Sequence, residues 1–378
     1  MSFANAAKFQ ASGPLHQDLK GRVDAYFQKT GKTRRDQPGM YLKSGLILGW
    51  WVASYLFLLL VASGPWSLVL GCVSLALAMA GVGFAVQHDA NHGGYSNHKR
   101  INRALAFFLD LVGGSSYVWR WKHNIFHHTH TNVDGLDSDV DIAPFARFAP
   151  TQRRRSFHRF QHWYMWLLYG LLGLKWHLVD DFQNVITGRV GGQRMPRPRG
   201  WSLVGFLAGK AAFFAWVLVI PSLFHPVPTV VGAYALTAGI LGVVIAVVFQ
   251  LAHCVEGTGF PALPIRGRFA VDWATHQLQT TVDFAPHNRV LTWFLGGLNF
   301  QVVHHLFPQV CHLHYPAIAQ LVAETCRDHG VAYLSQPTFR GALASHYRWL
   351  RAMGAPPVSV AEGTASSVQA RPGRALAA

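Results

Sequence analysis

Four long apolar runs dominate the pattern of hydrophobic and polar positions along the chain. Residues 45–64 and 66–87 form one pair and carry no charged residue. Residues 201–224 and 229–252 form a second pair, in which Lys210 is the one charged residue. A helix rises about 1.5 Å per residue, so about 20 residues cross the roughly 30 Å hydrocarbon core of a bilayer. The pattern therefore predicts four transmembrane helices.

The connectors and flanks of these runs predict how the helices are oriented. Residues 63–65 connect the two runs of the first pair, and residues 225–228 connect those of the second pair. Neither connector contains Lys or Arg. Apart from Lys210, the basic residues lie before the first pair, between the pairs, or after the second. Because basic flanks stay in the cytosol, we expect two helical hairpins that hang from one cytosolic face. Lys210 lies in the first half of its span, so we expect it to snorkel toward the nearer interface.

The remaining chain divides by composition. Residues 1–43 form a basic segment, expected in the cytosol, without the pattern of a signal peptide. Residues 44–353 are expected to form one membrane domain, because candidate functional residues come from both halves. Residues 354–378 are rich in Ala, Pro, Gly and Ser and predict a disordered tail. The apolar pieces 101–118 and 163–174 are too short or interrupted for spans and predict interfacial or core helices.

Composition and charge agree with a membrane protein. Of 378 residues, 51% are hydrophobic and only 13% are charged. The net charge of +16 would suggest nucleic acid in a soluble protein. Here the bilayer offers a better explanation, since anionic lipids attract basic flanks at about 1 kcal/mol per residue. We therefore expect the lipid bilayer, and no nucleic acid, as a partner.

Three short clusters of histidine stand beside the apolar runs, and the predicted topology brings them to one side of the membrane. Their members are His88, His92, His123, His127, His128, His304 and His305. The first two clusters contain histidines four residues apart, which share one face of a helix. Imidazole is a common metal ligand, and seven exceed what one zinc ion needs. With no cysteine in the clusters and few carboxylates, the pattern favours two irons used with O2.

Two further residues extend the candidate ligand set. His253 ends the fourth apolar run at about the depth of His88, which makes it a candidate eighth histidine ligand. The alternative is a single interfacial histidine without a partner. Gln301 stands three residues before His304, where another ligand would lie. Its neutral amide could bind a metal, hold a water on it, or hydrogen-bond a ligand.

Acidic residues close to the clusters are candidates to orient the ligands. A ligating imidazole usually donates its other N–H to a carboxylate or a carbonyl. The candidates are Asp89, Asp134, Asp137, Asp139 and Asp141. The last three alternate as in a calcium loop, but the central Gly and terminal Glu of that motif are missing. We name no catalytic residue beyond the metal ligands and no residue that binds an organic cofactor.

At this point the clusters resemble a known family. Residues 88–92 read HDANH, residues 121–132 read WKHNIFHHTHTN, and residues 299–308 read NFQVVHHLFP. These segments resemble the three histidine boxes of the integral-membrane fatty acid desaturases. The resemblance implies an all-α membrane protein whose cytosolic helical cap holds a di-iron site, completed by His253. Gln301 in the third box looks like the front-end branch, whose members insert a double bond between an existing one and the carboxyl end.

The resemblance also implies a reaction and its partners. The expected enzyme uses O2 to introduce a cis double bond into an acyl chain carried on CoA, a carrier protein or a phospholipid. Residues 250–256 and 273–285 look like bacterial members, which implies the bacterial inner membrane. The fused haem motif of many front-end desaturases is missing, so electrons are expected from a separate ferredoxin or cytochrome b5.

Two alternatives to a desaturase remain at this stage. The same boxes serve related di-iron hydroxylases and acetylenases. A non-redox zinc enzyme or metal transporter is the other alternative. A transporter should carry ionisable ligands near the middle of the membrane, whereas these clusters gather at one face.

Overall fold

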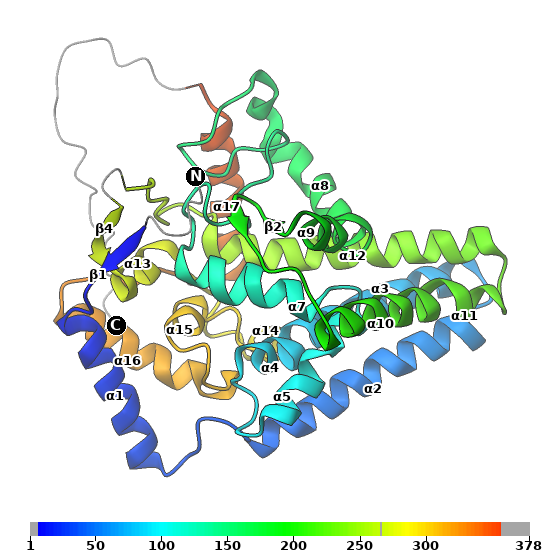
Figure 1. Ribbon diagram of the computed structural model, residues 1–378, viewed down its shortest axis with the longest axis horizontal. Coiled ribbons are helices and arrows are strands. Elements are labelled where there is room, and N and C mark those ends of the chain that lie inside the picture. Colours follow the sequence, from blue (N-terminus) through cyan, green and yellow to red (C-terminus); the bar gives the residue numbers. More distant parts are fainter. Residues whose placement is uncertain (1–6, 265–266, 357–378) are drawn as a thin grey trace.

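The computed structural model describes residues 7–264 and 267–356, and helices make up most of it. Its long helices extend together to one side, while short helices gather at the other (Figure 1). In the described residues, four helical stretches are long and apolar enough to cross a membrane, as predicted. They are α2 (Pro38–Leu60), α3 (Pro65–Val82) continued to His92, α10 (Trp201–Phe214) continued to Ser222 in α11 (Ile220–Ser222), and α12 (Val227–His253).

The ends of these stretches differ from the predicted ones. The first begins at Pro38 rather than residue 45 and ends at Leu60. Proline suits the first turn of a helix, because it lacks an N–H that would have no partner there anyway. The second passes through the π-helical segment Gly83–Gln87 and continues, beyond the predicted end at residue 87, into α4 (His88–His92). The first histidine cluster is therefore the last turn of a membrane-length helix.

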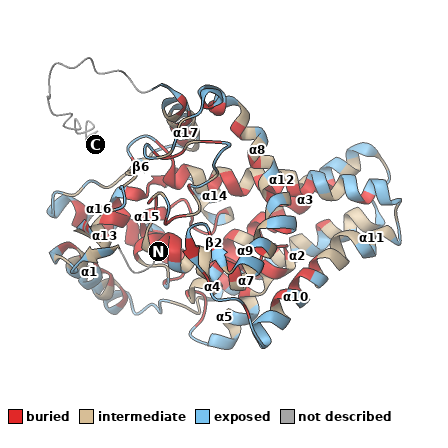
Figure 2. Cartoon of the chain, turned by 45° about the horizontal axis from the view of Figure 1, so that its top comes forward, coloured by how far each residue is buried: buried red, intermediate tan, exposed pale blue. Residues whose placement is uncertain are grey.

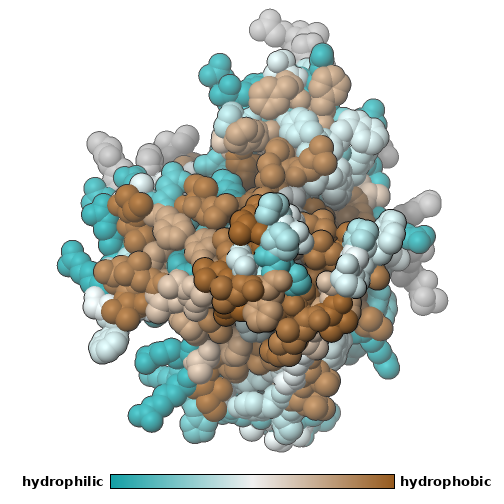
Figure 3. All heavy atoms as spheres, turned by 90° about the vertical axis from the view of Figure 1, so that its right-hand side faces the viewer, coloured by the Kyte–Doolittle hydropathy of each residue, from teal (hydrophilic) through white to brown (hydrophobic). Residues whose placement is uncertain are grey.

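The four stretches occupy inner and outer positions. In the most apolar part of the stretches ending at His92 and His253, 67% and 50% of the residues are buried, against 22% in the other two. Buried residues concentrate where the long and short helices meet, and the outer ends of the long helices are exposed (Figure 2). Many of the side chains exposed there are apolar, such as Trp66 and Leu223, which are 79% and 78% exposed. Hydrophobic residues dominate that end of the surface (Figure 3), which suits contact with lipid.

Lys210 does not snorkel, and that expectation is wrong. Its side chain points inward from α10 and is only 5% exposed. The ammonium group donates to Asp181 Oδ2 at 2.8 Å and to the Gly113 carbonyl at 2.7 Å. A buried charge needs such partners, and two segments that are distant in sequence supply them.

The stretch between the second and third apolar runs is a series of short helices. They are α5 (Lys99–Ala106), α6 (Phe108–Leu111), α7 (Ser116–Trp119), a π-helical segment (Arg120–His127), a 3-10 helix (Ser156–Phe160), α8 (Gln161–Lys175), a π-helical segment (Trp176–Asp180) and α9 (Asp181–Thr187). Helix α8 packs along α12, and glycines allow the close approach. A Cβ on Gly173 would lie 2.3 Å from the Ala238 carbonyl oxygen. The apolar piece 163–174 thus forms a packed helix, as expected.

The segments before α2 and after α12 form the rest of the short-helix side. Its helices are α1 (Pro14–Thr30), α13 (Trp273–Thr280), α14 (Arg289–Phe294), α15 (Gln301–Leu306), a 3-10 turn (His312–His314), α16 (Tyr315–Asp328) and α17 (Phe339–Gly354). Helix α1 packs on α16. The strands are β1 (Lys8–Gln10), β2 (Arg189–Val190), β3 (Gln193–Arg194), β4 (Arg268–Asp272), β5 (Asp283–Phe284) and β6 (Ser335–Gln336). They pair as β1–β4 and β5–β6, both parallel, and β2–β3, antiparallel. The predicted tail lies, from residue 357 on, outside the described residues.

Candidate metal centre

The eight candidate histidines converge where α4, the π-helical segment Arg120–His127, the end of α12 and α15 meet. All are buried except His92, which is partly exposed. Within each group, one ring nitrogen from every histidine lies within 4.8 Å of the others. One group is His88, His92, His123 and His304, a second is His127, His253 and His305, and a third is His128, His304 and His305. The third group shares His304 with the first and His305 with the second. The groups therefore form one continuous centre.

Helix α4 presents the first cluster as its spacing predicts. His88 and His92 are separated by one turn, and their ring centroids are 4.9 Å apart. The positive φ of Gly93, +72°, then ends the helix, and the Gly93 N–H bonds back to the Ala90 carbonyl. Glycine adopts this left-handed conformation without steric cost, so the chain can turn away directly after the second ligand candidate.

The second cluster lies on a π-helix rather than an α-helix. The wider π-helical turn pairs residues five apart. His123 and His128 therefore face each other, with 3.2 Å between their Nε2 atoms. His127 remains stacked beside His123, with 5.1 Å between ring centroids, and these two form a further group with Asp139. His127 also belongs to the group of His253 and His305. The π-helix thus distributes one cluster over the whole centre.

Helix α15 supplies His304 to the first group and His305 to the second, and both of them to the third. His304 Nε2 lies 3.0 Å from His128 Nε2, and the His305 ring stacks on the His128 ring at 4.2 Å. Asp283 anchors the start of the helix by accepting the Val302 N–H at 2.9 Å. Gly296, with φ +59°, lies before it, and a Cβ there would be 2.4 Å from the Phe84 carbonyl oxygen. This close approach brings α15 against the first cluster.

The outward-facing Nδ1 atoms of four histidines have protein partners. The partners are Asp137 Oδ2 for His127 at 2.9 Å, Gln277 Oε1 for His305 at 2.8 Å, the Thr280 carbonyl for His253 at 3.2 Å, and the Tyr315 hydroxyl for His304 at 3.3 Å. Such contacts fix the ring orientation and the tautomer. They leave the Nε2 atoms of these rings directed toward the centre.

The acidic candidates differ in whether they contact the histidine centre. Asp137 contacts His127, as expected. Asp89 instead accepts from His312 Nδ1 at 2.9 Å and is 4.0 Å from His88 Nδ1. Asp139 pairs with Lys122 at 3.0 Å and lies 3.6 Å from His127. The partner residues Gln277 and Tyr315 were missed, because neither stands near a cluster in the sequence. Their positions are set by α13 and α16.

Electrostatics keep most of the centre neutral. Burial, and then repulsion from neighbouring histidines, holds the pKa of His123, His128, His304 and His305 well below the ordinary range. These rings therefore stay in the neutral form that binds metals. Burial also opposes protonation of His127, but attraction to Asp137 outweighs it and raises that pKa. For Asp137, burial is outweighed by His127 and by hydrogen bonds, which lower its pKa to about 2.

The free nitrogens test whether metal ions fit. Among the described residues, the Nε2 atoms of His88, His92 and His305 are buried and have no hydrogen-bond partner. A buried polar atom without a partner costs about 1–3 kcal/mol. His128 Nε2 faces two other imidazole nitrogens at 3.0 and 3.2 Å. Cations at the centre would satisfy all of these atoms at once, so the residues fit a histidine-bound metal.

Gln301 lies at the second group. Its Nε2 donates to His253 Nε2 at 3.0 Å, and its side chain is buried. The structure therefore brings His253 beside His127 and His305, with Gln301 against it. The amide therefore lies beside the nitrogen of His253 that would bind a metal.

Fold and site together define a class: a helical membrane protein with a buried, histidine-lined centre at one end of its long helices. Residues 63–337 match the fatty acid desaturase family. The chain is 38% identical to an sn-1 linoleoyl-lipid 6-desaturase of Arthrospira platensis, over 94% of this chain and 97% of that protein. It is 39% identical to a protein of the same name from Synechocystis sp., over 94% and 99% of the two chains. An acyl-lipid (8-3)-desaturase of Physcomitrium patens is 37% identical, over 89% and 71%.

The chain therefore belongs to the fatty acid desaturase family, and it is an oxidoreductase. This confirms the resemblance seen in the three histidine boxes. It also removes the zinc enzyme and the metal transporter from consideration.

Proposed function

We propose that the chain is an O2-dependent di-iron desaturase that introduces a cis double bond into a lipid-linked acyl chain at a front-end position. The observation that carries this proposal is the convergence of eight histidines from four separate segments on one buried centre. The matching relatives, named for lipid-linked 6-desaturation, support the substrate class and the position.

The two irons would be held by different groups of the centre. One iron would be held by His88, His92, His123 and His304, and the other by His127, His253 and His305. His128 lies between them, near His304 and His305. When bound, the two irons would supply the activation of O2 and the oxidation of unactivated C–H bonds.

The overall reaction balances as follows. An acyl –CH2–CH2– unit loses two hydrogens and becomes –CH=CH–. These two hydrogens, with two electrons and two protons from outside, reduce one O2 to two waters. The protein orients the imidazoles through partners such as Asp137 and Gln277 and shields the centre by burial. It also has to hold one methylene pair at the centre, since rate and position depend on placement.

The electrons would come from a one-electron carrier of the ferredoxin or cytochrome b5 type. Each turnover needs two electrons that neither the acyl chain nor O2 supplies. The net charge of +16 suits an acidic protein partner as well as anionic lipid.

The proposed arrangement in the membrane is two hairpins, α2 with α3 and α10–α11 with α12, below a cytosolic cap of short helices. Residues 44–353 would form this domain, with residues 1–43 as a cytosolic segment. The inner membrane of a bacterium is the proposed location. Packing of α2 on α3 and the lack of Lys and Arg in both connectors support this topology.

Sidedness can be tested with inserted tags. Tags in residues 152–159 and after Gly354 should both report the cytosol, and tags at Gly64 and Pro226 should report the opposite side. The expected cause is the distribution of Lys and Arg. If residues 152–159 and Gly354 lay on opposite sides, the two halves of the histidine centre could not meet as described.

The product tests the function directly. Expression in a host of known lipid composition should yield a new cis double bond between an existing one and the carboxyl end, located by mass spectrometry. A variant with His127→Ala serves as the inactive control. A hydroxyl group or triple bond at that position would instead indicate the related hydroxylase or acetylenase reaction, and a methyl-side double bond would contradict front-end chemistry.

A further inference from the structure

Lys43 belongs to the basic flank before the first apolar run, yet the structure buries it. It lies near the start of α2 and is only 3% exposed. The hydroxyl of the neighbouring Ser44 contacts the Tyr95 hydroxyl at 2.8 Å, which fastens this part of α2 to the chain after α4. The ring of Trp293 covers the ammonium group, which lies 5.3 Å from the ring centroid. A buried ammonium group needs such partners, because burial removes its hydration.

Lys43 is one end of a buried chain of contacts that leads to the first histidine cluster. Its Nζ lies 2.8 Å from His312 Nε2, and His312 Nδ1 lies 2.9 Å from Asp89 Oδ2. The other carboxylate oxygen, Asp89 Oδ1, lies 4.0 Å from His88 Nδ1. Three separate segments, α2, the 3-10 turn and α4, thus meet at Lys43, His312 and Asp89, which we call the buried trio.

The backbone around His312 holds the middle member of the trio in place. The His312 N–H donates to Asp89 Oδ2 at 3.1 Å, and the preceding Cys311 N–H donates to the Arg34 carbonyl at 2.9 Å. Gly297, with φ +73°, lies on the other side, and a Cβ there would be 2.9 Å from His312 Cβ. Because Gly297 precedes α15, the trio is packed between the helices that carry the first and third clusters.

The donors and acceptors of the trio determine where its hydrogens lie. An ammonium group can only donate, so His312 Nε2 accepts from Lys43. Burial lowers the pKa of His312, so the ring is neutral and its hydrogen lies on Nδ1. From there it donates to the Asp89 carboxylate. The trio therefore joins one buried positive charge to one buried negative charge through a neutral ring.

Asp89 lies on the side of His88 that faces away from its free nitrogen. His88 Nε2 is buried and has no hydrogen-bond partner among the described residues. The separation of 4.0 Å from His88 Nδ1 is too long for a hydrogen bond, so the carboxylate acts on the ring through its charge. That charge favours a hydrogen on Nδ1, which leaves Nε2 free for a metal.

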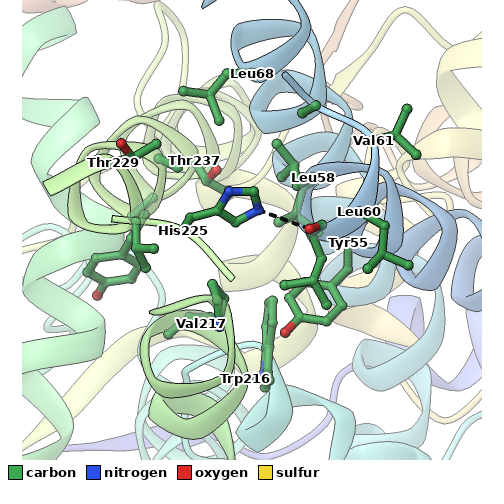
Figure 4. A pocket seen from close by; sticks show the side chains of 18 of the residues that line it. Tyr55, Leu58, Leu60, Val61, Leu68, Trp216, Val217, His225, Thr229 and Thr237 are labelled. Atoms are coloured by element: carbon green, nitrogen blue, oxygen red, sulfur yellow. Dashed lines mark hydrogen bonds between the residues drawn. The ribbon is translucent and has the colours of Figure 1, made fainter. Parts of the chain in front are cut away.

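Polar contacts elsewhere between the long helices do without charged partners. At the end away from the histidine centre, these helices line an apolar cavity of ≈ 600 Å³. Of the described residues that line it, none is Asp, Glu, Lys or Arg. His225, one of them, has its Nε2 2.9 Å from the Leu59 carbonyl oxygen (Figure 4). A buried polar contact here thus needs no ion, whereas the trio places two charges beside a candidate iron ligand.

We propose that Lys43 is a positioning residue that acts through His312 and Asp89 and makes the iron centre easier to reduce. The proposal rests on the proposed function, in which each turnover takes up two electrons. A buried negative charge favours oxidised iron, because oxidised iron is the more positive form. Lys43 offsets part of the charge of Asp89 and so shifts the balance toward reduced iron.

Lys43→Gln tests the charge by itself, since the amide keeps an N–H donor for His312 but is neutral. The full-length, iron-loaded variant is poised at the midpoint potential of the unaltered protein. Mössbauer spectroscopy then reports the ratio of ferrous to ferric iron. Lys43→Gln should lower this ratio about tenfold, which is the effect of a unit charge roughly 12 Å away at an effective dielectric constant of about 20.

Lys32→Gln is the matched control. It makes the same substitution in the same basic flank, but Lys32 is exposed, and water and salt screen its charge. Its ratio of ferrous to ferric iron should equal that of the unaltered protein.

Asp89→Asn should change the ratio in the opposite direction, because it removes the negative charge and keeps an acceptor for His312. The double variant Lys43→Gln with Asp89→Asn leaves no charge in the trio, so its ratio should return close to that of the unaltered protein. Either single variant decides the question if the other does not fold.

A Lys43→Gln protein that keeps its iron with an unchanged ratio would overturn the proposal. So would Asp89→Asn with a lowered ratio, and so would a loss of iron in Lys43→Gln that the double variant does not restore, since Lys43 would then build the site rather than adjust it. Failure of the proposed function would be distinct, because the unaltered protein would then hold no reducible iron and form no double bond.

Discussion

His304→Ala should lose at least one iron and reduce desaturation to background. His304 is a member of two of the three histidine groups, and its Nε2 lies 3.0 Å from that of His128. Among the described residues that reach the centre, no carboxylate stands beside His304 to replace it. Metal analysis of the purified protein and product yield in the same preparation would measure both losses.

Gln301→Ala is the matched comparison on the same helix. The amide contacts His253 at 3.0 Å, but an amide is a weak ligand, so the variant should keep most of its iron. Its activity should fall about 10- to 100-fold, the usual cost of losing a residue that orients a ligand. Full activity of His304→Ala would contradict the ligand assignment. Activity of Gln301→Ala at the normal rate would assign Gln301 a purely structural role.

Lys210→Met should destabilise the protein by about 3–5 kcal/mol, because it leaves the Asp181 carboxylate buried without its cation. The two side chains are only 5% and 2% exposed and lie 2.8 Å apart. The Gly113 carbonyl would lose its donor as well. Denaturant or thermal unfolding in detergent would measure the loss.

The double variant Lys210→Met with Asp181→Leu provides the control. Replacing both charges by apolar groups of similar volume removes the unpaired carboxylate, so most of the stability should return. If Lys210→Met alone were as stable as the unaltered protein, the ammonium group would be reaching water, as the sequence pattern had suggested. The double variant would then bring no recovery.

Much of this protein could be predicted from local features of the chain. Apolar runs of more than about 20 residues predict spans by length alone, since the bilayer sets that length. The four-residue spacing of His88 and His92 predicts a shared helix face, and the structure has it. The desaturase family likewise follows from three short segments. Each is a local pattern, so it can be recognised without knowing how the helices pack.

Other features depend on contacts between distant segments, and no local pattern contains them. The sequence could not show that Arg120–His127 forms a π-helix, which sets His123 against His128. It could not show Gln277 as the partner of His305, since helix packing sets that contact.

The sequence by itself determined the four membrane-length helices, the three histidine boxes and hence the family, because each depends on residues close together in the chain. Only the tertiary structure decided how the eight histidines divide and which partners orient them. It also reversed the prediction for Lys210, whose environment depends on Asp181 and Gly113. A buried charge is stable only where the fold brings its partners, and that is a property of packing rather than of sequence spacing.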